Sequence, residues 1–162
     1  MPSQKQDYLL RLIEELGQLV REIVNLRQQG NHDAALHIFL QAQERLFARP
    51  AQEFMTQPIE EQLHLLVIGE TSANAREKCV MYAALLTEAG HTYLAREQTA
   101  LASGAYQLAL HILLLTALHH PAPDAAEDRT RIAALLNLLP GDQLVTEVKE
   151  MLDQFQAAGQ KS

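Results

Sequence analysis

Tryptophan is absent from the sequence, and aromatic residues of all kinds make up only 5% of the chain. Runs of β-branched residues are nearly missing as well, so we do not expect a β-sheet. Leucine and alanine must therefore build the core, and both are strong helix formers. Because 48% of the 162 residues are apolar, the chain is globular rather than disordered. The composition predicts an all-α fold in a single domain over residues 1–162.

A basic excess is also lacking, since 13 Lys and Arg residues face 20 Asp and Glu residues and the net charge is −7. Nucleic acids and acidic membrane surfaces are bound through clustered cations, so we expect neither as a partner. Residues 1–6 contain no apolar signal-peptide stretch. The most apolar run, 108–118, is shorter than the roughly 20 residues that span a bilayer. We therefore expect a cytoplasmic protein.

Cys79 is the only cysteine, so an intramolecular disulfide is excluded. It lies among apolar residues at helical spacing, and we interpret it as a small core residue rather than a nucleophile. A G-x-S-x-G motif and a phosphate-binding glycine loop are also missing. We assign no catalytic residue and no cofactor, and an enzyme is the less favoured kind of function.

Metal-binding spacings are missing too, although the sequence has seven histidines: His32, His37, His64, His91, His111, His119 and His120. No two of them are spaced as H-x-x-x-H or H-E-x-x-H, and the cysteine has no C-x-x-C partner. The sequence therefore predicts no metal site. The pair His119–His120 is expected in the last turn of a helix, where the helix dipole favours a cation.

Apolar residues at helical spacing are what the sequence does contain. Residues 7–29 carry the clearest pattern, with apolar positions three and four apart at Leu9, Leu12, Leu16, Leu19, Ile23 and Leu26. The same periodicity, together with capping signals, predicts the other helices: 31–47, 58–69, 74–103, 105–119, 124–139 and 141–158. Residues 51–56 are expected to form a short helical turn. Asn74 and Asp124 are the predicted N-caps of the helices that follow them.

The sequence also repeats itself at a displacement of about 74 residues. Gly17 then falls on Gly90, and Gly30 falls on Gly104. Each unit reads as a long helix with a glycine in its middle, a glycine turn and a shorter helix. We expect the second glycine of each unit to make the turn of a helical hairpin. Gly17, which costs about 1 kcal/mol inside a helix relative to alanine, is expected to mark a close contact with another backbone.

The helix after each turn carries small and large residues in a fixed order, Ala35, Phe39 and Ala42 in the first unit and Ala109 and Leu113 in the second. This pattern, with Pro121 after the second hairpin, resembles the tetratricopeptide repeat over 16–47 and 88–121. The resemblance implies antiparallel helical hairpins with a concave surface that holds peptides or proteins, capped by a helix pair over 121–158. It also implies that His37 and His111, at equivalent places in the hairpins, face outward.

The opening Asp7-Tyr8-Leu9-Leu10-Arg11, with Ile13-Glu14, resembles the start of a group of small bacterial proteins with no assigned function. That resemblance implies a helical fold and a bacterial source, and no activity.

Glu97 breaks the apolar pattern of its helix. Either the face of the helix drifts and Glu97 lies at an exposed edge, or it is a partly buried acid, paired with Arg or Tyr, that marks a pocket near Tyr93. Three polar residues on the long first helices, Arg21, Asn25 and Arg96, are candidates for a partner surface.

These observations favour a non-enzymatic module for protein–protein interaction or scaffolding. The alternatives are a small-molecule-binding protein or enzyme with a pocket between the hairpins near Glu97, and a self-assembling structural protein. We also expect a homodimer through helix 7–29, because helix 31–47 can cover only part of its wide apolar stripe. The intramolecular alternative is that helix 58–69 or the C-terminal helices fold back over that stripe.

Overall fold

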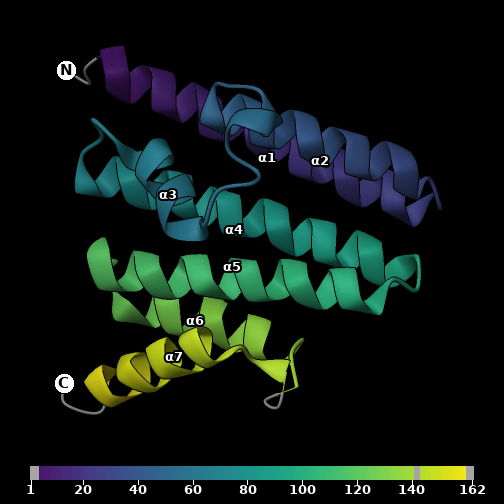
Figure 1. The fold of residues 1–162 in the computed structure, drawn as a ribbon. Coiled ribbons are helices and arrows are strands. Elements are labelled where there is room, and N and C mark those ends of the chain that lie inside the picture. The colour runs from purple at the N-terminus through teal and green to yellow at the C-terminus, as the bar shows by residue number, and fades with distance from the viewer. Residues whose placement is uncertain (1–3, 141–142, 160–162) are drawn as a thin grey trace.

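The computed structural model describes residues 4–140 and 143–159. Within them the chain forms seven α-helices, one short 3-10 helix and no β-strand, which confirms the all-α prediction (Figure 1). The helices are α1 (Gln4–Gln28), α2 (His32–Phe47), α3 (Ile59–Val67), α4 (Ser72–Ala95), α5 (Thr99–His119), α6 (Ala125–Leu136) and α7 (Thr146–Gly159), and the 3-10 helix is η1 (Ala51–Glu53).

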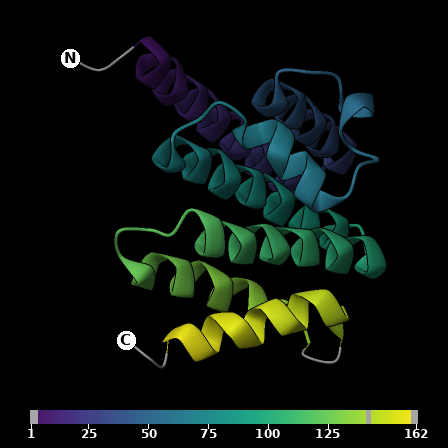
Figure 2. The ribbon, with the colours of Figure 1, turned by 60° about the vertical axis from the view of Figure 1, so that its left-hand side comes forward.

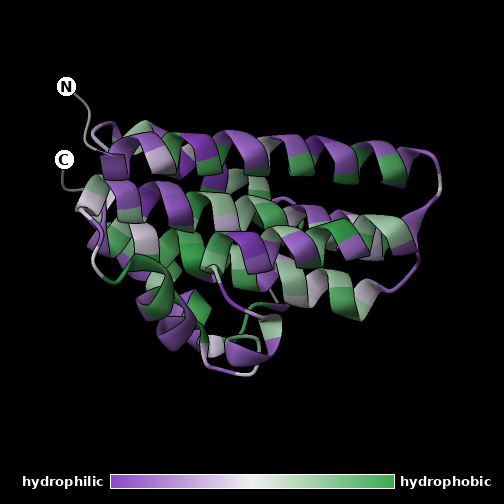
Figure 3. Ribbon diagram, turned by 90° about the horizontal axis from the view of Figure 1, so that it is seen from above, coloured by the Kyte–Doolittle hydropathy of each residue, from purple (hydrophilic) through white to green (hydrophobic). Residues whose placement is uncertain are grey.

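The helices are arranged in three layers. The pair α1–α2 forms the first layer, α4–α5 the second and α6–α7 the third, and the layers remain distinct when the molecule is turned (Figures 1 and 2). Helix α4 contacts α1, α2, α3 and α5, whereas α6 and α7 pack on α5. Hydrophilic and hydrophobic residues alternate along the helices (Figure 3). The amphipathic pattern is clear in α1 and α7, each with one buried face, whereas α4 and α5 have buried residues around most of their circumference. The fold is therefore organised around the α4–α5 pair.

The first hairpin turn lies where the sequence places it. Gly30 has a φ of +78°, in the left-handed region that glycine adopts without strain. The amide of Asn31 donates to the Leu26 carbonyl at 2.8 Å, which closes the end of α1. The Asn31 side chain then accepts from the amide of Ala34 at 3.4 Å and caps α2. The turn at Gly30 is thus confirmed.

The second hairpin turn does not lie at Gly104. Helix α4 ends at Ala95, and the chain reverses through residues 96–98, where Glu97 has a φ of +62°. The amide of Gln98 donates to the Tyr93 carbonyl at 2.9 Å, so hydrogen bonding supports a left-handed residue that is not glycine. Gly104 lies inside α5. The predicted helix over 74–103 and the predicted turn after it are therefore wrong.

Helix capping follows the sequence in part. Asp124 accepts from the Ala126 amide at 2.9 Å and caps α6, as predicted. Asn74 does not cap α4, because Thr71 does so by accepting from the Asn74 amide at 3.2 Å. The two predicted C-terminal helices are present as α6 and α7. Helix α7 begins at Thr146, later than the predicted start at residue 141, and residues 141–142 lie outside the described part of the chain.

The apolar stripe of α1 is covered within the same chain. Leu9, Leu12, Leu16 and Ile23 are buried, and α1 packs against both α2 and α4. The expectation that α2 alone would face this stripe is therefore wrong, and so is the alternative that α3 or the C-terminal helices cover it. The central helix of the fold supplies the second covering surface.

The two mid-helix glycines have different surroundings. A Cβ atom on Gly17 would meet only Arg21 Nη1, 3.9 Å away, so the predicted close contact at Gly17 is not found. A Cβ atom on Gly90 would overlap the ring of Tyr106 on α5, with Cδ1 only 2.6 Å away. Gly90 is buried and lets α4 approach this aromatic side chain. Close packing at a helix glycine therefore occurs in the second hairpin and involves a side chain.

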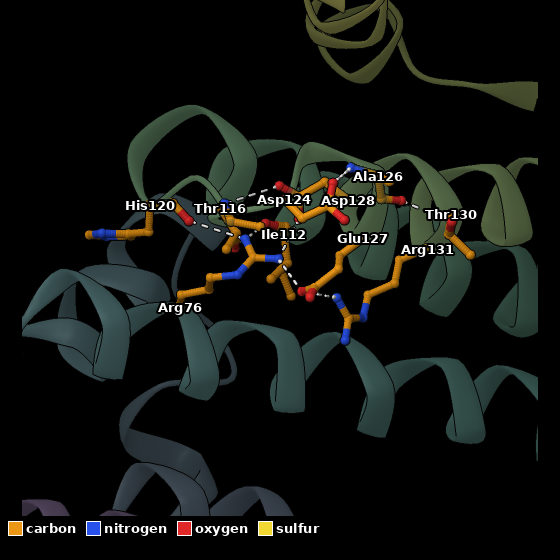
Figure 4. Close-up of polar contacts among 11 residues, drawn as sticks. Arg76, Ile112, Thr116, His120, Asp124, Ala126, Glu127, Asp128, Thr130 and Arg131 are labelled. Atoms are coloured by element: carbon orange, nitrogen blue, oxygen red, sulfur yellow. Dashed lines mark hydrogen bonds and ion pairs between the residues drawn. The ribbon is translucent and has the colours of Figure 1, made fainter.

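A buried ion pair fastens the third layer to the second. The guanidinium of Arg76 on α4 contacts Asp128 on α6 and donates to the backbone carbonyl of His120 at 3.1 Å (Figure 4). Asp128 also accepts from the amide of Ala122 at 3.5 Å. The guanidinium of Arg76 thus holds both ends of the segment that connects α5 to α6.

Helix α5, with 21 residues, is long enough and apolar enough to cross a membrane by length and composition alone. The apolar run 108–118 is thus only part of this helix, which corrects the expectation that the run is too short to span a bilayer. Of its most apolar window, 56% is buried within the fold, where α5 lies between α4 on one side and α6 and α7 on the other. A helix in the core of a protein can be as long and as apolar as a membrane-spanning helix, so these two properties do not distinguish the two cases.

Candidate functional site

An apolar cavity opens between α2, α4 and α5 and has a volume of about 450 Å³. Its walls include Phe39, Tyr82, Leu86, Tyr93, Leu101 and Leu108. The segment between η1 and α3 adds Met55 to the rim. We call this cavity the apolar groove.

The rim of the apolar groove exposes large apolar side chains to solvent. Met55 is 50% exposed, Leu101 51% and Leu108 41%. The two leucines are seven residues apart on α5, so they lie on one face of that helix, with Gly104 and Ala105 between them. A strip of large side chains flanking small ones can accept the ridge of another helix.

Of the five residues proposed from the sequence, Tyr93 lines the apolar groove. Arg96 pairs with Asp33 of α2, with Nη1 2.7 Å from Oδ1, and so links the two hairpins. Arg21 and Asn25 are exposed on α1. The structure does not gather the five residues into one site.

Glu97 is exposed in the turn between α4 and α5. The hypothesis of a partly buried acid that marks a pocket is therefore wrong. The exposed alternative is correct, although the reason is a turn and not a drifting helix face.

A polar cluster between α1 and α4 was not signalled by the sequence. Arg27 Nη1 lies 2.8 Å from Glu88 Oε2, and both side chains are more than four-fifths buried. Next to it His91 Nδ1 lies 2.7 Å from the Tyr106 hydroxyl. Burial lowers the pKa of His91, Glu88 opposes that shift and Arg27 adds to it. These contacts join three helices and leave no unpaired charge for catalysis among the residues named here.

A second cavity, of about 430 Å³, lies between α3, α4 and α5. Six of its lining residues can titrate or donate hydrogen bonds: Glu60, His64, Cys79, Thr116, His119 and His120. Burial raises the pKa of the Cys79 thiol to about 11, so it stays protonated near neutral pH. Cys79 therefore behaves as the predicted core residue. His120 Nδ1 lies 3.0 Å from the hydroxyl of Ser72, and burial, followed by the neighbouring His119, lowers the pKa of His120.

His111 does not face outward as the tetratricopeptide resemblance implied, because it is only 6% exposed. His37, its expected equivalent, is exposed and contacts Gln41. His111 lies instead beside Glu60 of α3 and Glu147 of α7. These three residues are far apart in sequence, so no spacing motif could have identified them.

Comparison of the chain with protein-family models, with curated proteins and with solved structures gives no match. The resemblance to tetratricopeptide repeats and to small bacterial proteins therefore stays a prediction.

Proposed function

We propose that the protein is a non-enzymatic interaction module that binds an amphipathic α-helix of a partner protein in the apolar groove. The observation that carries this proposal is the exposure of Met55, Leu101 and Leu108 around one open cavity. Large exposed apolar side chains that gather at one place are typical of binding surfaces. Scattered single residues would carry no such meaning.

The chemistry of the groove favours a helix as the partner segment. Its exposed leucines are one heptad apart on α5, which suits a ligand with apolar residues at positions i, i+3, i+4 and i+7. The chain has a net charge of −7, so basic residues on the outer face of the ligand would favour association. The proposed partner segment is therefore an amphipathic helix with a basic polar face.

The alternative function, a small-molecule site or an enzyme near Glu97, has weaker support. The volume of the groove is within the range of ligand sites, but Glu97 lies exposed in a turn and supplies no buried acid. Co-purification of a metabolite, detected by mass spectrometry after denaturing the protein, would favour this alternative.

A synthetic peptide tests the proposed function directly. A fluorescein-labelled helix of about five turns, with leucines on one face and lysines on the other, is titrated with the protein and followed by anisotropy. The double variant Leu101→Glu/Leu108→Glu should weaken binding at least about tenfold, because both charges would lie against the apolar face of the ligand. Leu10→Glu, which changes a leucine on α1 that is 58% exposed and outside the groove, should leave the affinity unchanged.

Amide chemical-shift changes on peptide binding should gather on α5 around Leu101 and Leu108 and near Met55. Equal affinities for the groove variant and the wild type, or shift changes confined to other helices, would reject the groove as the binding surface. Circular dichroism on each variant establishes that the fold is retained.

A homodimer through helix 7–29 also remains a prediction. Its original reason is weakened, because α4 and α2 bury half of the apolar stripe and leave Leu19, Val20 and Leu26 partly buried. The large apolar side chains that the described part of α1 leaves exposed are Tyr8 and Leu10. Light scattering distinguishes a monomer of 18.1 kDa from a dimer, and Leu10→Lys weakens the dimer if α1 is the interface.

A further inference from the structure

His111 is a buried histidine with an unsatisfied ring nitrogen. It lies in the middle of α5, and its Nε2 atom is buried without a hydrogen-bond partner. Carboxylate oxygens approach this atom from two other helices, Glu60 Oε1 at 3.6 Å and Glu147 Oε1 at 3.9 Å. Both distances exceed that of a hydrogen bond. A buried polar atom left unpaired costs stability, so this arrangement calls for a ligand or a proton between the three groups.

We propose that Glu60, His111 and Glu147 form a binding site for a divalent first-row transition-metal ion. One ligand atom from each residue lies within 4.8 Å of the other two. Ligand atoms around a tetrahedral Zn²⁺ are about 3.4 Å apart, given bond lengths of about 2.0–2.2 Å. The two separations from His111 exceed this value by roughly half an ångström or less, which the mobile ends of two glutamates can close.

The three side chains differ in mobility and exposure in a way that suits the binding of a metal ion. His111 is held in place by burial, whereas Glu60 is half exposed and Glu147 more than half. An ion can therefore reach the carboxylates from solvent and settle against a fixed imidazole. Glu60 and Glu147 also lie in the first turns of α3 and α7. The two carboxylates offset the charge of a divalent ion.

The donor atoms restrict the kind of ion. Ca²⁺ and Mg²⁺ prefer sites made of oxygen atoms alone, whereas an imidazole nitrogen with two carboxylate oxygens suits Zn²⁺, Mn²⁺, Fe²⁺ or Co²⁺. Three protein ligands leave one position open for water or a further ligand. The ligands come from α3, α5 and α7, so a bound ion would clamp the C-terminal helix to the middle of the fold.

Calorimetry with Zn²⁺ as the probe tests the site. Full-length protein is freed of metal with a chelator and titrated with ZnCl₂ at pH 7.5. We expect one ion per chain, with affinity that falls as the pH is lowered to 6, because protons compete for the ligands. Glu60→Gln and Glu147→Gln should each weaken binding at least about tenfold, and His111→Gln should abolish it.

Matched controls separate this site from general effects of charge. Glu61→Gln and Glu150→Gln remove exposed acids from the same two helices and should leave the affinity unchanged. The double variant His64→Gln/His119→Gln removes two histidines from the neighbouring cavity and should also retain the site. Because Glu60 and Glu147 are exposed, their variants should fold even if His111→Gln does not.

The position of the ion is read from anomalous scattering at the zinc absorption edge, in crystals grown with Zn²⁺. A peak between the three side chains supports the proposal. Absence of one-to-one binding at 100-fold excess of Zn²⁺ over a micromolar protein concentration, on the order of 0.1 mM, overturns it. Affinity that depends on His64 and His119 but not on Glu60 and Glu147 also overturns it.

Discussion

The guanidinium nitrogen Nη2 of Arg76 lies 2.6 Å from Oδ1 of Asp128, and more than nine-tenths of each side chain is buried. Asp128→Asn would leave the buried Arg76 cation with only one carboxylate nearby, that of Glu127, which is 56% exposed and whose Oε2 lies 3.9 Å from Nη2. We therefore expect a loss of about 3 kcal/mol in the free energy of unfolding. Urea denaturation measures the change. Arg131→Gln, which removes the exposed ion pair with Glu127, should cost less than about 1 kcal/mol. Equal losses in the two variants would contradict the importance of burial.

Gly90→Ala should destabilise the protein by about 1–3 kcal/mol, because the added methyl group overlaps the ring of Tyr106. Gly104→Ala should instead stabilise it by about 0.5–1 kcal/mol, since Gly104 lies inside α5 with no atom within 4 Å of the added methyl group. Thermal unfolding of the two variants gives opposite signs. Destabilisation by Gly104→Ala would favour the turn that the sequence suggested.

Glu97→Gly should stabilise the protein by about 1 kcal/mol, because glycine adopts a φ of +62° without the cost that an L side chain incurs. The same substitution within a regular helix, Glu150→Gly, should destabilise it by about 1 kcal/mol. Chemical denaturation compares the pair. A loss of stability in Glu97→Gly would show that the acid makes contacts that the exposed turn does not provide.

The free energy of unfolding should fall as the pH is lowered from 7.5 to 5.5. Burial lowers the pKa of His91 and of His120 below the unfolded value of about 6.5, so the unfolded chain binds more protons in this range. The stability that these two histidines contribute as neutral groups is fully present above about pH 6.5 and is lost as the pH falls through their lowered folded-state pKa values. His91, which faces Tyr106, Glu88 and Arg27, should account for part of the slope.

Urea unfolding of His91→Gln at both pH values tests this assignment, with His37→Gln, an exposed histidine, as the control. A smaller pH dependence is expected in the first variant and an unchanged one in the second. A wild type that is more stable at pH 5.5 than at pH 7.5 would reverse the argument.

The helices could be predicted because amphipathic periodicity records burial on one face. Leu9, Leu12, Leu16 and Ile23 illustrate this, and each is buried as its spacing indicates. The turn at Gly30 was predictable because the left-handed conformation selects glycine. The same preference led to a wrong prediction of the second turn at Gly104, because Glu97 adopts the left-handed conformation and Gly104 stays helical.

The surroundings of α5 could not be predicted from its own sequence. Helices pack against it from several sides, so its apolar residues show no outward face by which His111 could be placed. Glu60 and Glu147 approach His111 only through the packing of α3 and α7. The apolar groove was missed for a similar reason, because nothing in the sequence of this apolar helix marks Leu101 and Leu108 as exposed.

The position of α4–α5 between two outer helix pairs also bears on how the native state fluctuates. Helices α4 and α5 share the most extensive packing in the fold, so amide hydrogen exchange should be slowest in these two helices. The apolar groove lies at the boundary of α2 with this centre, and Glu60, His111 and Glu147 meet at the boundary with α7. A helix bound in the apolar groove would therefore slow amide exchange first in α2, and a metal ion bound by Glu60, His111 and Glu147 would slow it first in α7.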